Sequence, residues 1–420
     1  MPSVIHAQTS RTNIGAETTM GTVATTMKHI QILDGDPAAE LATQTAPNPA
    51  QVRRQREFVA PVILTRKGSS LKLRVALKKV PAILNAAASP VAFNDSSALS
   101  HQLIMRAAFG GELTPAAGSV VVSSSGTPVN SITVTGGHGA RFAVGQIIIV
   151  TGEGPRRVTA ISTDTLTIKP PLSASPSVGA VIRNAYNYHV VEKDSQTFSI
   201  EHAPVESGTP TAETRALGCR GQGAFKLDVN ALSEVELTFT AADWQGPGDL
   251  SVGDAPAADD MAETLAWNPT VWLADAAFAT LPSSSDEIAT AAATLPRKWQ
   301  EVAGSVVNGV GSVHDVAGRG EPIDIDVEGL IDADWETRFT AGTELSLVMY
   351  TTVGSGSSAR YFGLWFPTVK VVESPKRKTN EALLYSTAKL RAFMAVDIGG
   401  ATPALSTAEI VTSNVVAFMG

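Results

Sequence analysis

The sequence predicts a mainly β protein that carries one or two helices and a small inserted all-β domain. Apolar and polar residues alternate strictly in several runs, which is typical of strands with one buried face. Short runs rich in Val, Ile and Thr, separated by Gly, Pro and Asp-Thr, fill residues 118–188 and indicate tight hairpins. Helical spacing is clear in residues 94–111.

Residues 1–55 are rich in Thr, Ala, Gln and Pro and predict an extended N-terminal arm with one strand. Residues 56–117 predict the first part of a β module. Its strand has apolar residues at every second position, and these residues are Leu71, Leu73, Val75 and Leu77.

The predicted helix begins near a capping residue, Asn94 or Asp95, and ends at Gly110 and Gly111. One stripe along it is apolar. The stripe consists of Leu99, Leu103, Ala107 and Ala108.

Residues 118–188 interrupt the module as an insertion, and its strand pattern continues in residues 189–250. Two alternating runs there have these apolar positions: Phe225, Leu227, Val229, Val235, Leu237 and Phe239. Residues 251–420 repeat the style and predict a second β module. A weak echo links 227–232 to 325–330 and 239–241 to 339–341. Duplication and chance both explain it.

The only cysteine, Cys219, lies within Gly218–Gly223, whose glycine order differs from the G-x-G-x-x-G of dinucleotide-binding turns. Strand patterns follow it, so the segment predicts a turn, with Cys219 as a small buried apolar residue rather than a nucleophile. The histidines form no zinc-protease spacing, and no nucleophile elbow or phosphate-binding loop occurs. The sequence therefore predicts no catalytic residues, no cofactor and no enzyme activity.

An acidic group in residues 324–336 is the best candidate for metal binding. Asp324, Asp326 and Glu328 share one face of a predicted strand, and Asp332 and Asp334 follow. The fixed spacing of a calcium-binding loop is absent. A solvated acidic strand face is therefore the favoured interpretation, and no metal is predicted.

Composition narrows the class of protein. Hydrophobic residues make up 44% of the 420 residues, enough for a substantial core, whereas only 17% are charged. So few charges indicate a surface rich in Ser, Thr and Gly or one covered in part by other subunits. The formal net charge of −8 argues against general nucleic-acid binding. No leader peptide and no membrane-spanning stretch is expected.

Charge is distributed unevenly along the chain. Nine basic residues and one acid lie between 51 and 80, whereas six acids and no base lie between 243 and 263. Oppositely charged surfaces favour head-to-tail stacking of identical subunits, with ordinary scattered charge as the alternative. The candidate contact residues are Arg53, Arg54, Arg56, Arg66, Lys67, Asp254, Asp259 and Asp260.

Several segments resemble the major tail tube proteins of long-tailed bacteriophages. Residues 12–25, "TNIGAETTMGTVAT", are similar to the opening strand of those proteins, and residues 68–84 to the strand that leads into their helix. Residues 196–244 resemble the family's central unit of a strand, a Gly-Cys turn and two further strands. The insertion resembles a small β add-on of some members, and residues 250–420 match only in style.

The resemblance implies tail-tube β-sandwich or barrel modules whose strands join those of neighbouring subunits. Rings that are hexameric, or trimeric and pseudo-hexameric, then stack into a hollow tube. The tape-measure protein occupies this tube first, and double-stranded DNA later passes through without specific binding. Tail terminator and distal tail proteins bind the ends. The protein would belong to the virion tail, be assembled in the host cytoplasm and bind no membrane.

Chain length bears on the ring. Roughly 300 residues remain outside the arm and the insertion, about two domains of ordinary size. With the internal echo, this favours two tube modules per chain and a trimeric ring. Acids lining the bore would repel DNA phosphates. The candidate lumen-facing residues, chosen by alternation, are Lys226, Asp228, Glu234, Glu236, Asp324, Asp326 and Glu328.

Three alternatives make different predictions. A distal tail or terminator ring of the same fold would not polymerise by itself. A glycan- or receptor-binding β protein would expose aromatic residues of the insertion, which are Phe142 and, at its margin, Tyr186 and Tyr188. A secreted hydrolase would need a catalytic site and a leader peptide.

Overall fold

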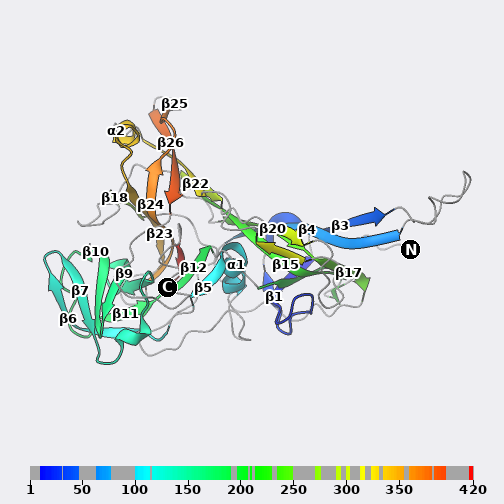
Figure 1. The fold of residues 1–420 in the computed structure, drawn as a ribbon, viewed down its shortest axis with the longest axis horizontal. Helices are drawn as coiled ribbons and strands as arrows, with labels where there is room; N and C mark the ends of the chain where they lie inside the picture. Colours follow the sequence, from blue (N-terminus) through cyan, green and yellow to red (C-terminus); the bar gives the residue numbers. More distant parts are fainter. Residues whose placement is uncertain are drawn as a thin grey trace, which may run out of the picture.

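The computed structural model describes most of the chain in separate ranges. They are residues 10–30, 32–46, 63–76, 100–113, 116–190, 196–206, 209–210, 213–228, 234–248, 270–275, 290–294, 299–302, 313–316, 323–330, 334–353, 359–380, 383–393 and 416–419. Strands dominate these ranges, and two α-helices occur in them, α1 (Ser100–Phe109) and α2 (Asp334–Ala341). The predicted mainly β fold is confirmed (Figure 1).

The largest sheet joins strands from both halves of the chain. Its strands pair in the following order: β3 (Ile32–Ala46), β4 (Ile63–Ala76), β16 (Glu234–Ala241), β15 (Glu213–Asp228), β19 (Thr290–Thr294), β22 (Ile323–Leu330), β26 (Leu383–Phe393), β24 (Arg360–Val371), β23 (Leu345–Val353) and β18 (Thr270–Asp275). Because β19 pairs with both β15 and β22, the two halves share one continuous sheet.

Shorter strands complete the body of the molecule. Strands β1 (Ser10–Ala16), β13 (Phe198–Glu206) and β17 (Asp243–Gly248) continue from the first half of β15. The remaining strands of the body are β2 (Lys28–Ile30), β5 (Gly110–Leu113), β12 (Tyr186–Val190), β14 (Thr209–Pro210), β20 (Trp299–Val302), β21 (Val313–Val316), β25 (Lys376–Asn380) and β27 (Val416–Met419). The described part of residues 1–55 thus holds three strands where one was expected, and Ile14 of β1 is fully buried.

Strand β15 passes straight through the glycine segment 218–223, so the predicted turn there is wrong. Up to Cys219 β15 pairs with β13 and β17, and from Arg220 onward it pairs with β16 and β19. Gly218 has a φ of 62°, which an L-residue with a side chain rarely adopts. The glycines therefore let one strand change partners without ending.

Helix α1 packs directly on these glycines. A Cβ on Gly223 would lie 2.6 Å from Cβ of Ala108, and one on Gly221 would lie 2.9 Å from the carbonyl oxygen of Ala107. The predicted helix is confirmed over Ser100–Phe109, and Gly110, with a φ of 89°, follows its last residue. Asn94 and Asp95 lie outside the described residues.

The helix is more deeply buried than its predicted stripe implies. All of its residues are buried except Arg106, because β15, β5, β12 and β1 all contact it. One apolar core joins it to the large sheet and to β1 and β13, and Phe109, Phe198 and Phe225 are among its largest fully buried side chains. Burial of this apolar area is the main force that stabilises the body.

One of the two matches in the internal echo does not mark equivalent elements. The other, between 227–232 and 325–330, includes positions 229–232 outside the described residues and stays a prediction. Residues 239–241 end strand β16, whereas their counterpart 339–341 ends helix α2. The matching Phe-Thr-Ala triplets are therefore a coincidence of composition.

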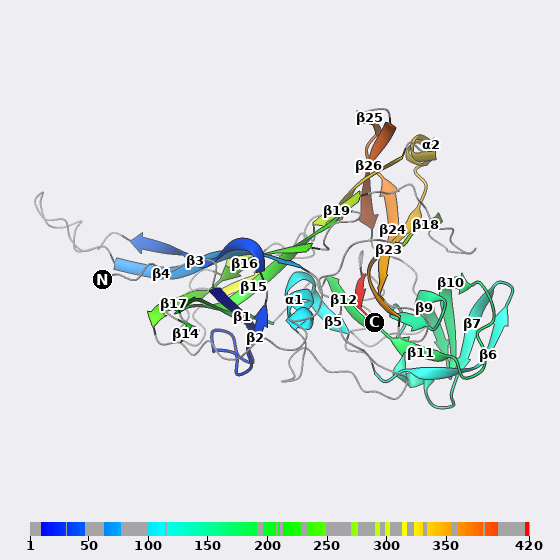
Figure 2. The ribbon, with the colours of Figure 1, turned by 180° about the vertical axis from the view of Figure 1, so that it is seen from behind.

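A closed six-stranded barrel lies within the segment that was expected to be an insertion. Its strands follow the order β10 (Thr165–Leu172), β7 (Val129–Val134), β6 (Ser119–Gly126), β11 (Val181–Asn184), β8 (Ile147–Val150) and β9 (Gly154–Ser162). Pairing between β9 and β10 closes the barrel. The inside is filled by a separate apolar cluster that includes Ile132, Leu166 and Ile182. The barrel and the β3–β4 hairpin lie at opposite ends of the molecule (Figures 1 and 2).

The barrel is attached to the body through a third apolar cluster. Ile147 and Ile149 of β8 point outward and pack with Val348 and Trp365 of the large sheet. A guanidinium nitrogen of Arg183 donates a hydrogen bond of 2.7 Å to the carbonyl oxygen of Ala359. These contacts fix the barrel against strands β23 and β24.

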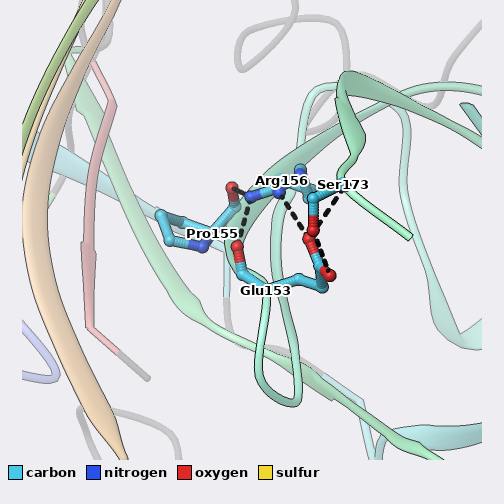
Figure 3. Close-up of polar contacts among 4 residues, drawn as sticks. All are labelled: Glu153, Pro155, Arg156 and Ser173. Atoms are coloured by element: carbon cyan, nitrogen blue, oxygen red, sulfur yellow. Dashed lines mark hydrogen bonds and ion pairs between the residues drawn. The ribbon is translucent and has the colours of Figure 1, made fainter. Parts of the chain in front are cut away.

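Arg156 adds a buried cation to this attachment. Its guanidinium lies 5.1 Å from the ring centre of Trp272 and donates hydrogen bonds of 2.6 and 2.9 Å to the carbonyl oxygens of Glu153 and Pro155. Glu153 also accepts a hydrogen bond of 2.7 Å from Ser173 (Figure 3). Burial lowers the pKa of Arg156 to about 10, against the opposing effect of Glu153. The cation is therefore held by packing, by carbonyl groups and by the carboxylate of Glu153, which lies 3.3 Å from a guanidinium nitrogen.

Candidate functional site

The candidate site lies on the side of the large sheet that the barrel covers at β24, β23 and β18. The part of this side from β4 to β26 carries charged residues, and we call it the charged face. Strand alternation produces it: Val235 and Leu237 are fully buried on the other side, while Glu234 and Glu236, which alternate with them, are half-buried. The same alternation occurs on β4, where Leu71, Leu73 and Val75 are buried and Lys72 and Arg74 are exposed. It occurs again on β22, with Ile323, Ile325 and Val327 buried.

Register brings the sequence-predicted lumen residues of both halves together. Glu234 lies opposite Lys226, which lies opposite Ala292, which in turn lies opposite Asp326. One row along, Asp228 and Glu328 both lie opposite Thr290. Because directly paired residues in antiparallel strands share a face, these candidates belong to one surface. The sequence did not predict that β19 lies between β15 and β22, since β19 has no charged residue that would have marked it as part of this face.

Ion pairs cover much of the charged face. Lys72 Nζ lies 2.8 Å from Glu236, and Arg74 lies 3.4 Å from Glu234. These pairs link β4 to β16 across the ladder.

A second group of ion pairs lies on β22 and β26. Arg391 donates two hydrogen bonds, of 2.7 and 3.1 Å, to the carboxylate of Asp324. Lys389 lies 3.3 Å from both Asp324 and Glu373. The hydrogen bonds from Arg391, aided by Lys389, lower the pKa of Asp324. The hydrogen bonds that Lys389 donates to Glu373 and Asp324 raise the pKa of Lys389.

These partners revise the expected electrostatics of the face. The sequence predicted a bore lined by acids, but Glu234, Glu236 and Asp324 each lie beside a Lys or Arg. The fields of neighbouring charges of opposite sign largely cancel at a distance, and salt at physiological concentration screens the remainder beyond about 8 Å. The face is therefore polar and close to charge-balanced, so it neither strongly attracts nor strongly repels a phosphate backbone.

Replacing Asp324 by Asn is expected to lower the free energy of unfolding by about 0.5–1 kcal/mol near neutral pH. Its folded pKa lies below the unfolded value, so its stabilisation is present above an unfolded pKa of about 4 and is lost as the pH falls through the folded pKa. Urea unfolding should show a smaller difference between wild type and variant at about pH 3 than at about pH 7. Equal differences at both pH values would contradict this assignment.

The candidate metal ligands that lie in the described part of the chain do not converge. Among the described residues, no group of three or more His, Cys, Asp and Glu side chains is arranged to hold a metal ion. The carboxylate of Asp324 is bound by Arg391 and Lys389, and Asp326 is exposed. Asp334 is the first residue of α2, and Asp332 lies outside the described residues.

The residues expected at ring–ring contacts fall largely beyond the described ranges. Arg66 and Lys67 belong to β4, where they lie opposite Gln44 and Thr43 of β3. The others, Arg53, Arg54, Arg56, Asp254, Asp259 and Asp260, lie outside the described residues. Head-to-tail stacking through these charges stays a prediction.

Cys219 is packed as a small apolar residue in the core. It is fully buried on β15, opposite Phe198, and burial raises the pKa of its thiol well above the usual value. A thiol in this state is a poor nucleophile. Its buried position agrees with the sequence interpretation, although it lies in a strand rather than at a turn.

The carboxylate of Glu17 organises a polar centre that the sequence interpretation missed. One oxygen accepts hydrogen bonds of 2.9 Å from the hydroxyl of Ser199 and from the backbone N–H of Gly218. The other accepts bonds of 2.7 Å from the hydroxyl of Thr197 and 2.9 Å from the backbone N–H of Gly21. Glu17 and Gly21 lie in the "ETTMG" stretch, so this motif has a structural role: it ties the loop after β1 to β13 and β15.

The aromatic residues of the insertion do not form a binding platform. Phe142 is 6% exposed, Tyr186 is 4% exposed and Tyr188 is fully buried. They pack in the barrel and the body, and are not available for stacking on a sugar ring.

Comparisons with protein-family models and with curated proteins find no match for this chain. Neither helix in the described part of the chain is long and apolar enough to cross a membrane.

Proposed function

We propose that this protein is a structural subunit of a hollow tube, the major tail protein of a long-tailed bacteriophage. Copies join strand to strand into rings, and rings stack head to tail. Double-stranded DNA passes through the bore. The tape-measure protein and the proteins that cap the two ends of the tube are the other expected partners.

The observation that carries this proposal is the continuous sheet, which has one buried side, a charged face from β4 to β26 and edge strands that pair on one side only. Among the described strands, β18 pairs on one side only, with β23, and β3 pairs only with β4. Exposed strand edges favour pairing with another chain, and closing a ring of subunits satisfies them. A sheet that spans both halves of the chain supplies a broad wall for such a ring.

The charged face supports DNA passage without binding. Specific and non-specific DNA binding both depend on Lys and Arg that neutralise phosphates. Here the bases nearest the candidate acids are already engaged by carboxylates. A lumen lined in this way would let the duplex slide.

Electron microscopy of the concentrated, purified protein tests the tube directly. We expect hollow filaments of uniform diameter. Discrete rings that do not polymerise would instead indicate a terminator or distal tail protein. Monodisperse single particles at all concentrations would contradict both assignments.

Thiol labelling tests which face lines the bore. Cysteine at Asp326 is expected to react with a bulky polymer-linked maleimide in dissociated subunits and to be protected in filaments. Cysteine at Val178, which is 78% exposed on the barrel, is the matched control and should react in both states. The buried Cys219 adds little background. Equal labelling of Asp326→Cys in both states would place the charged face outside the lumen.

A further inference from the structure

Strand β27 fills a slot between strands that are distant in sequence. Its residue Ala417 lies opposite Tyr188 of β12 on one side and opposite Leu364 of β24 on the other. Val416, Phe418 and Met419 pair on both sides in the same way. Figure 1 shows this short red strand close to β12. The slot thus connects the first half of the chain to the second.

The walls of the slot are buried. Tyr188 and Leu364 are fully buried, and Trp365 is 2% exposed. Backbone N–H and C=O groups at such depth need hydrogen-bond partners, because leaving them unpaired costs free energy. The slot therefore requires a strand whenever the body is folded.

The link to β27 is much longer than the distance it has to cross. Strand β26 ends with Phe393 opposite Thr368 of β24, and β27 begins with Val416 opposite Trp365 of the same strand. Three residues of a strand span about 10 Å. Residues 394–415, which join the two points, could reach about 70 Å when extended. This surplus length is enough to carry β27 into a neighbouring molecule.

We propose that the slot between β12 and β24 accepts β27 from a second copy of this chain in the assembled protein. The same backbone pairs form whichever copy supplies the strand, so exchange costs little contact energy. Neighbouring subunits hold each other's slots at high effective concentration, which favours exchange over long times in the assembly. This step rests on the proposed tube, and each exchanged strand would tie one subunit to the next.

Paired cysteines test the exchange. One variant carries Leu364→Cys and the other Ala417→Cys, which lie opposite each other across the β24–β27 pair, at a separation that a disulfide can span. The two variants are mixed, assembled at high concentration and oxidised. In unexchanged molecules neither cysteine meets a partner. With exchange, about half of the Leu364→Cys chains should become covalent dimers with Ala417→Cys chains.

The controls separate this proposal from the tube itself. Leu364→Cys mixed with Val178→Cys gives the background of random oxidation, and Phe362→Cys with Met419→Cys is a second opposed pair if the first weakens folding. Filaments without mixed dimers above background would overturn the exchange and leave the tube intact. Mixed dimers without filaments would support the exchange and count against the tube. Neither product would overturn both.

Discussion

Replacing Glu17 by Gln will lower the free energy of unfolding by about 3 kcal/mol, because one carboxylate satisfies four donors. A glutamine keeps the size of the side chain but replaces one acceptor oxygen with an amide that can only donate. That amide would face two donors in a buried site, since Glu17 is only 6% exposed. The loss is measured by urea unfolding of wild type and variant.

The matched control is Glu336→Gln. Glu336 is 75% exposed and makes one long ion pair of 3.8 Å with Arg377, so its replacement should change the free energy of unfolding by less than about 0.5 kcal/mol. A similar small effect for both variants would show that the Glu17 centre contributes little. Increased hydrogen exchange at the backbone N–H groups of Gly21 and Gly218 would accompany the predicted loss.

The strands were predictable from sequence where a period of two is a local property. Alternation over Leu71–Val75, over Val235–Phe239 and over Ile323–Val327 places one set of side chains in the core, and the structure confirms each. The same alternation placed the charged residues on the opposite face. Both follow from strand geometry, in which successive side chains point to opposite sides of the sheet.

The glycine segment could not be interpreted from its own residues. Gly and polar residues between two alternating runs usually mark a turn. In β15 they instead give space to α1, whose residues Ala107 and Ala108 come from more than a hundred positions earlier in the chain. Only the fold shows which glycines bend the backbone, as Gly218 does, and which admit a neighbour.

Pairing between strands that are distant in the sequence could not be predicted from the sequence either. Arg391 and Lys389 lie far along the chain from Asp324, and nothing in either run predicts that β22 and β26 are neighbours. The prediction of an acidic face therefore left out the basic residues, such as Arg391 and Lys389, that lie beside its acids. The acidic residues of the face were identified correctly from the sequence. Their electrostatic effect depends on which basic residues the register between distant strands places beside them.

Replacing Gly223 by Ala will lower the free energy of unfolding by about 2–3 kcal/mol, although it adds one methyl group. The new Cβ would lie 2.6 Å from Cβ of Ala108, a distance that real carbon atoms do not reach, so α1 must move away from β15. Since α1 is buried nearly all round, that movement disturbs the contacts of the helix with β5 and β12 as well. Denaturant unfolding measures the loss.

Gly136→Ala is the matched control, because a Cβ there meets no atom within 4 Å. It should change the free energy of unfolding by less than about 0.5 kcal/mol.

If the clash between the two Cβ atoms causes the loss of stability, removing the Cβ of Ala108 should relieve it. Ala108→Gly alone costs about 1 kcal/mol as a glycine in a helix, yet in the Gly223→Ala background it should restore stability. A double-mutant cycle should therefore show favourable coupling of about 2 kcal/mol. Purely additive effects would mean that α1 does not rest on β15 at this glycine, and that the close approach of helix and strand is not what the glycine provides.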